Sequence, residues 1–148
     1  MTVGAVTSEP ATVSVFPRSP CIFAIDGSGC GQPIALNYSP DGKPNLISPE
    51  NLAQPRDDIS ICFTGYGIVR NQPADGYPSD KTLIQGGLTG LVVVLGQKMR
   101  VVTASYIGKE PGLVGVDQVR FQIPADAPEG CSVPFRILTS PLTRSLTA

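Results

Sequence analysis

The sequence predicts an all-β protein, an immunoglobulin-like antiparallel β-sandwich of about seven to nine short strands. Three observations lead to this fold class. Apolar and polar residues alternate with a period of two in many short segments. The 16 glycines and 15 prolines are about twice the average usage and separate these segments by turns. No window shows the helical spacing of apolar residues over three turns.

The strands are expected in chain order at roughly ten-residue spacing, each bounded by turn residues. In 59–63, for example, Ile59, Ile61 and Phe63 share one face of a half-buried strand. The turn at 26–29 (DGSG) and the hairpin at 96–98 (GQK) separate neighbouring strands. The expected strands are 12–15, 21–25, 34–38, 59–63, 88–95, 100–107, 116–123, 133–137 and 142–147. All five phenylalanines fall on these alternations and are predicted to be core residues: Phe16, Phe23, Phe63, Phe121 and Phe135.

Length and charge limit the domain organisation and the classes of partner. The 148 residues suffice for one domain with a sizeable core. We expect a flexible N-terminal segment over 1–10 and a single β-sandwich domain over 11–148. The net charge of −1, with scattered Lys and Arg, gives no basic surface for nucleic acid. No apolar run approaches the roughly 18 residues that span a bilayer, so membrane insertion is not expected.

The four cysteines favour disulfides over metal binding. They show no C-x-x-C spacing, and the chain has no histidine, which disfavours zinc. Cys30 and Cys131 each follow a glycine in a turn, and we prefer a Cys30–Cys131 bridge, which leaves Cys21 with Cys62. The hairpin register disfavours Cys21–Cys30, because bridged Cα atoms lie within ~7 Å. Four reduced thiols are the alternative. Disulfides would indicate an oxidising compartment and therefore export.

The residues offer little for catalysis. Without histidine, the usual general base and the usual partner of a Ser or Cys nucleophile are missing. The aspartates lie mostly beside Gly or Pro, where Asp usually closes a turn; they are Asp26, Asp41, Asp57, Asp58, Asp75, Asp80, Asp117 and Asp126. Calcium at converging turns is the one metal weighed, but the regular Asp-x-Asp-x-Asp spacing is missing. We expect no enzyme activity, no cofactor and no metal.

One long segment is the candidate binding surface. Residues 65–87 are rich in Gly, Pro and Asp and have no clear period. A loop of this length is often functional. Tyr66 and Tyr77, with Asp75 between them, are the residues expected to be exposed there and to bind a glycan or protein.

Several segments together suggest a family. The clearest are 111–124 (PGLVGVDQVRFQIP) and 127–134 (APEGCSVP), and further matches are 27–29 (GSG), 64–67 (TGYG) and 73–76 (PADG). In this order, over roughly 12–138, the chain resembles uncharacterised C-terminal domains of exported proteins from Solibacter-type acidobacteria. It departs at 138–141 (LTSP), where that family has a Gly-rich turn before its last strand.

The resemblance implies an immunoglobulin-like module at the C-terminus of varied exported bacterial proteins, without a known activity. We therefore expect a non-catalytic structural or interaction module of an exported multidomain protein, located outside the cell or at its surface. Its partners would be other domains of the same polypeptide, or an extracellular protein or glycan. The alternative is a ligand-binding module that uses the 65–87 loop. A fold alone does not decide between them.

Overall fold

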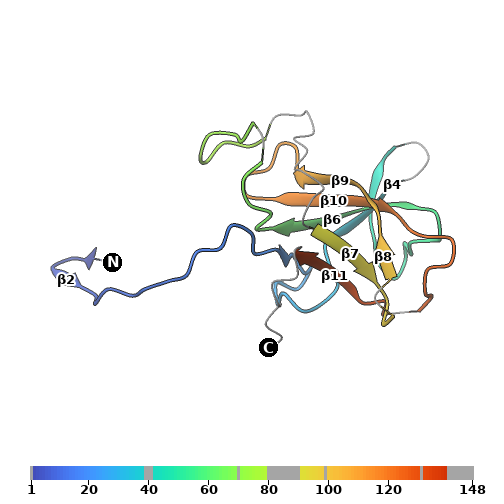
Figure 1. The fold of residues 1–148 in the computed structure, drawn as a ribbon, viewed down its shortest axis with the longest axis horizontal. Coiled ribbons are helices and arrows are strands. Elements are labelled where there is room, and N and C mark those ends of the chain that lie inside the picture. Colours follow the sequence, from blue (N-terminus) through green and yellow to red (C-terminus); the bar gives the residue numbers. More distant parts are fainter. Residues whose placement is uncertain are drawn as a thin grey trace.

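The computed structural model describes residues 2–38, 42–69, 71–79, 91–98, 100–130 and 132–139. These residues form eleven strands in three antiparallel sheets and contain no helix, so the all-β prediction is confirmed (Figure 1). No helix in the described part of the chain could therefore cross a membrane.

The largest sheet has six strands in the order β5-β4-β6-β10-β9, with β3 pairing to the end of β6. β6 and β10 each pair with strands on both sides, and both faces of each are largely buried. Their register places Val119 opposite Ile61 and Phe121 opposite Ile59. The bounds are β3 (Cys21–Ile22), β4 (Ala35–Tyr38), β5 (Pro44–Leu46), β6 (Asp58–Thr64), β9 (Ala104–Lys109) and β10 (Asp117–Gln122).

A second sheet packs on the apolar face of the first and completes a β-sandwich (Figure 1). It contains β7 (Leu91–Leu95) between β11 (Phe135–Thr139) and β8 (Arg100–Val102). Phe121 of the large sheet stacks on Phe135 of the small one, with ring centroids 5.6 Å apart. The core contains buried residues of both sheets: Ala35, Ile59, Ile61, Phe63, Leu95, Val102, Ile107, Val119 and Phe121, with Tyr66 and Val69 from the following loop.

The chain changes sheets inside one predicted strand. We expected a continuous strand over 100–107, but it is broken at Thr103. Residues before the break pair with β7, and residues after it pair with β10. A strand that bends between two packed sheets forms a corner of the sandwich and joins its two layers covalently.

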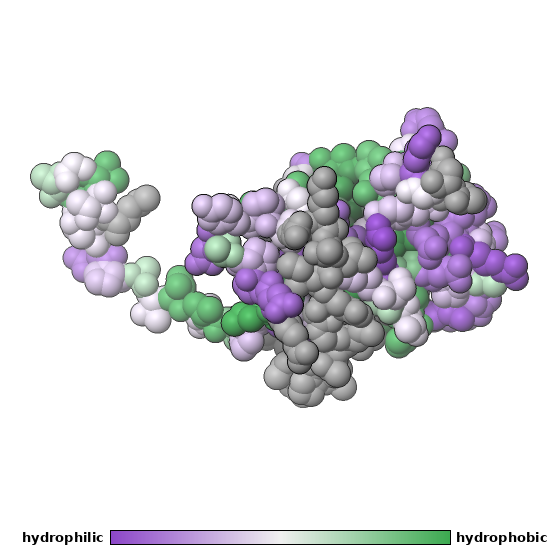
Figure 2. Space-filling model, turned by 90° about the horizontal axis from the view of Figure 1, so that it is seen from above, coloured by the Kyte–Doolittle hydropathy of each residue, from purple (hydrophilic) through white to green (hydrophobic). Residues whose placement is uncertain are grey.

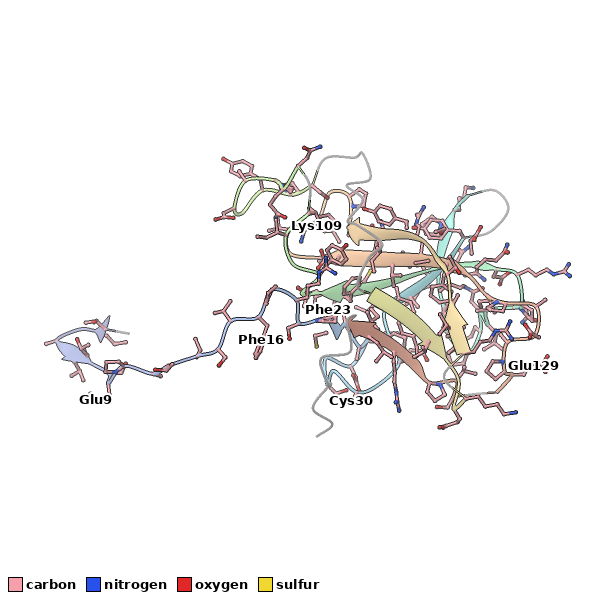
Figure 3. The ribbon with its side chains drawn as sticks, viewed as in Figure 1. Glu9, Phe16, Phe23, Cys30, Lys109 and Glu129 are labelled. Atoms are coloured by element: carbon pink, nitrogen blue, oxygen red, sulfur yellow. The ribbon has the colours of Figure 1, made fainter. Side chains whose placement is uncertain are left out.

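The expected strand at 12–15 is wrong. Residues 2–16 form an extended N-terminal arm that projects away from the sandwich (Figure 1). Near its tip β1 (Thr2–Val3) and β2 (Val6–Thr7) form a small hairpin of exposed residues. Phe16, predicted as a core residue, is exposed on the arm (Figure 3). Alternation predicted extended backbone correctly here, but the pairing strand is missing among the described residues. The strand expected at 142–147 lies outside the described residues.

The cysteines with a described position form no disulfide. Cys21 and Cys30 are exposed free thiols, and Cys62 is a buried one. The expected Cys21–Cys62 bridge is wrong because Cys21 lies opposite Thr64, two residues from Cys62. Such diagonal neighbours have Cα atoms roughly 7–8 Å apart, beyond ordinary disulfide geometry. Cys30, which we paired with Cys131, lies on the 26–31 turn (Figure 3), and Cys131 lies outside the described residues.

Burial makes Cys62 the least reactive of these thiols. Burial, reinforced by the nearby Glu110 carboxylate, raises the pKa of Cys62 to about 11. At pH 8 roughly one thiol in a thousand is then ionised, and only the thiolate is a good nucleophile. We expect iodoacetamide at pH 8 to alkylate Cys21 and Cys30 in the folded, unreduced protein, and Cys62 only after unfolding. Peptide mass mapping reads this out. Protection of Cys21 and Cys30 that a reductant removes would show disulfides and contradict the free-thiol state.

Candidate functional site

The predicted binding loop begins at a glycine that no other residue can replace without movement of the backbone. Gly65 has a φ of 81°, in the left-handed region. A Cβ at this position would lie 2.0 Å from the carbonyl oxygen of Ser19. The two residues approach closely because the Ser19 N–H donates to the Gly65 carbonyl oxygen at 2.9 Å. The chain therefore leaves β6 in a fixed direction.

Tyr66 is buried, which corrects the expectation that it is an exposed binding residue. Its exposed fraction is 0%. Its backbone N–H donates to Oδ2 of Asp117 at 2.9 Å. The Arg18 guanidinium carbon lies 5.1 Å from its ring centroid, within cation–π distance. Burial raises the pKa of the Tyr66 hydroxyl, so it stays protonated at neutral pH. Tyr66 is an anchor of the loop and not a free ligand-binding side chain.

Asp117 connects the loop to the sheet. It is the first residue of β10, and its register places it opposite Phe63 of β6 and Lys109 of β9. Its side chain is 1% exposed, and its Oδ1 lies 2.8 Å from Nζ of Lys109. Lys109 lies at the end of β9, near the base of the loop (Figure 3). A buried carboxylate is tolerated only with such compensation, so we assign Asp117 a structural role.

Ser79 holds the far end of the described loop. Its buried hydroxyl donates to the carbonyl oxygen of Glu110 at 2.6 Å. The Gly112 N–H donates back to the Ser79 carbonyl oxygen at 2.9 Å. The segment 65–79 is thus held at its start by the first residue of β10 and at its end by the connection between β9 and β10. Residues 70 and 80–87 of the predicted loop lie outside the described residues.

Between its anchors the loop exposes two large apolar side chains. Tyr77 is 70% exposed, as expected. Asp75 lies in a turn in which the Tyr77 N–H donates to the Ala74 carbonyl oxygen. Ile68 is 88% exposed and was not predicted. The signal was present in Gly67-Ile68-Val69: if Val69 is buried, its neighbour in an extended segment points outward.

A small group of buried ionisable side chains lies next to the second anchor. Burial raises the pKa of Glu110, and the Arg120 guanidinium partly offsets this. Its Oε2 accepts no hydrogen bond from a described residue. Burial and the Glu110 charge also raise the pKa of the Tyr106 hydroxyl to about 12. That hydroxyl donates to the Lys109 carbonyl oxygen at 2.8 Å, so it is already engaged by backbone.

The outer face of the large sheet carries a second candidate surface. The Arg120 guanidinium lies 4.0 Å from the Tyr38 ring centroid, and its Nε donates to Oε1 of Gln118. The buried Ser60 hydroxyl donates to the same Oε1 at 3.0 Å. An open pocket of about 560 Å³ adjoins this group and is lined by Tyr38, Gly42, Arg56, Asp57, Asp58, Ile59, Ser105 and Arg120. Arg120 is held by Gln118 and Tyr38, and none of the described residues that line this pocket has a buried side-chain polar atom without a hydrogen bond.

Asp26 and Asp57, two of the aspartates of the calcium hypothesis, are engaged in separate hydrogen bonds. Asp26 accepts hydrogen bonds from the Ser28 N–H and hydroxyl, and these bonds hold the pKa of its carboxyl below the usual range. Asp57 accepts from the Asn37 side chain and the Gln54 N–H. Asp41 and Asp80 lie outside the described residues. Within the described ranges, no three His, Cys, Asp or Glu side chains form a group that could hold a metal ion.

Comparison with known proteins gives no further assignment. The chain matches no protein-family model, no curated protein and no solved structure. Its function is therefore inferred from its own residues and their geometry.

Removal of the Asp117 carboxylate should be strongly destabilising. Asp117→Ala leaves Lys109 and the Tyr66 N–H without their buried partner, and we expect a loss of about 3–5 kcal/mol in the free energy of unfolding. Asp117→Asn keeps an acceptor for Tyr66 and should cost less. Asp75→Ala, at an exposed position, should change stability by less than about 0.5 kcal/mol. Urea unfolding measures all three. Equal stability of the Asp117→Ala and Asp75→Ala variants would refute the anchoring role.

Glu110 should make the fold less stable as pH rises. Because the pKa of Glu110 is raised in the folded state, that state binds the proton more tightly than the unfolded chain. The free energy of unfolding therefore falls as pH rises from the ordinary value of the carboxyl to its raised value. We expect Glu110→Gln to be more stable than the wild type at pH 7 and similar at pH 4. Glu50→Gln is the control, since a hydrogen bond from Ser48 lowers the pKa of Glu50. A Glu110→Gln variant that is less stable at pH 7 would contradict the assignment.

Proposed function

We propose that the chain is a non-catalytic β-sandwich module that binds another protein surface through its N-terminal arm. The proposal depends on the exposure of apolar side chains on the arm: Val13 is 76% exposed and Val15 is 88% exposed. Val3, Val6 and Phe16 are exposed on the same arm. Figure 2 shows hydrophobic (green) residues at the tip of this projecting segment and on the part nearest the sandwich, with polar residues between them. Concentrated exposed apolar surface on a soluble domain is typical of an interaction site.

A non-catalytic role is supported by how the buried polar groups are used. Asp117 accepts a hydrogen bond from the Tyr66 N–H, and the Ser79 hydroxyl donates to the Glu110 carbonyl oxygen. Gln118 and Ser60 bond to each other inside the sheet. The sequence contains no histidine to act as general base. These groups stabilise the fold and are not free to act on a substrate.

The wider context of the proposal comes from the resemblance to acidobacterial C-terminal domains. It supports an immunoglobulin-like topology and a place outside the cell or at its surface, within an exported multidomain protein. Other domains of the same polypeptide or an extracellular protein would then be the surfaces that the arm contacts. We propose no cofactor, and no nucleic-acid or membrane partner.

A ligand-binding module is the second candidate, and the loop favours it through two residues. Ile68 and Tyr77 are exposed on a segment that Tyr66 and Ser79 fix at both ends. A loop that is hydrogen-bonded near both ends loses less entropy on binding than a free one, which favours recognition of a glycan or protein. Tyr66, in contrast, belongs to the anchor and not to this surface.

Site-specific photo-crosslinking separates the two candidates. A photoreactive phenylalanine analogue is placed at Phe16 or at Tyr77, both exposed, in cells that produce the whole polypeptide. We expect one defined protein adduct from position 16 and none from position 77. Adducts from position 77 alone, or a glycan-array signal abolished by Tyr77→Ala and Ile68→Ala, would favour the loop. Absence of adducts from both positions would refute an interaction module.

A further inference from the structure

The arm contains an extended segment, 12–16, that pairs with no strand among the described residues. In 12–16, Val13 and Val15 share one side of an extended segment and Ser14 lies on the other. Among the described residues, no backbone hydrogen bond joins 11–16 to either sheet. The segment contains no charge and is rich in β-branched residues. Such a segment is suited to pair with the edge of a sheet.

The base of the arm is fixed to the sandwich. The Ser19 N–H bonds to Gly65, and the carbonyl oxygen of Pro17 lies 2.3 Å from where a Cβ of Gly67 would be. This close approach holds residues 17–19 against the start of the loop. From this base the arm points away from both sheets (Figure 1). It is therefore positioned to reach another molecule.

β11 is the edge best suited to receive the strand. Among the described strands, the ends of the two large sheets are β5, β9, β8 and β11. β5 and β8 have three residues each, and β5 includes Pro44, which protects an edge. β9 is buried at Ile107 and Gly108 and has a register irregularity opposite Arg120 and Phe121. β11 has five residues without Pro or Gly, and its second edge pairs with no described strand.

We propose that residues 12–16 of one copy pair with β11 of a second copy, and that the second copy returns the same contact. The chain carries both the donor strand and the acceptor edge, so two copies satisfy both by a reciprocal, two-fold exchange. This inference rests on the proposed function, of which it names the partner. Val13 and Val15 then lie beside Phe135 and Ile137, which pack against the core and are still partly exposed.

The test is the mass of the full chain in solution. Sedimentation equilibrium over 1–200 µM, roughly the range of moderate affinities, should show a monomer–dimer equilibrium. Val13→Asp with Val15→Asp should raise the dimer dissociation constant on the order of 100-fold, because the two carboxylates would be buried without partners. Val3→Asp with Val6→Asp adds the same charge to the arm outside 12–16, and this matched control should dimerise like the wild type. All four positions are exposed, so both variants should fold.

A wild-type chain that stays monomeric up to 200 µM would overturn the proposal, as would a dimer unaffected by the changes at Val13 and Val15. Amide exchange adds a second readout: 12–16 should be protected only in the dimer. Protection of 12–16 in the monomer would show that the arm folds back on its own sheet, which also overturns the exchange. If the chain is monomeric but position 16 still crosslinks to another protein, only the second-copy partner is wrong and the proposed function stands.

Discussion

The side chain of Asp117 joins three parts of the molecule that are distant in sequence. It holds Lys109 at the end of β9 and the Tyr66 backbone at the start of the loop, and it begins β10 opposite Phe63. A charge that is 1% exposed requires these partners. The direction in which the chain leaves β6 therefore depends on this carboxylate together with the Gly65–Ser19 contact. Asp117 thus holds the start of the 65–79 loop against the sheet, and Ser79 holds its far end to Glu110.

The two sheets are held together by packing and by the chain itself. Phe121 and Phe135 stack across the layers, and the break at Thr103 carries the chain from one sheet to the other. In the described structure the large sheet has six strands and the small one three. Among the described strands the small sheet ends at β11, where Phe135 and Ile137 are partly exposed. The apolar extended segment 12–16 projects from the same chain. The arm and the outer edge of β11 are therefore the two described surfaces best suited to pair with another strand.

Period-two alternation predicted β6 and β10 well, because the two faces of a strand differ in every second residue. It failed at Phe16 and at Thr103, since alternation shows which side chains share a face but not which strand lies beside them. The backbone of Tyr66 is held by Asp117, 51 residues away, and no local pattern carries that contact. The exposure of Tyr77 was predictable because a turn at Asp75-Gly76 places the next residue at the surface.

Native-state hydrogen exchange of the Tyr66 amide tests most directly whether a buried carboxylate fixes the loop to the sheet. This N–H is donated to Asp117 in the interior, so it should exchange only when the whole domain unfolds, at the rate of the β6 and β10 amides. The amide of Val15 on the exposed arm is the internal reference for fast exchange in the monomer. A Tyr66 amide that exchanges as fast as that of Val15 would show that the loop opens independently, and would contradict this account.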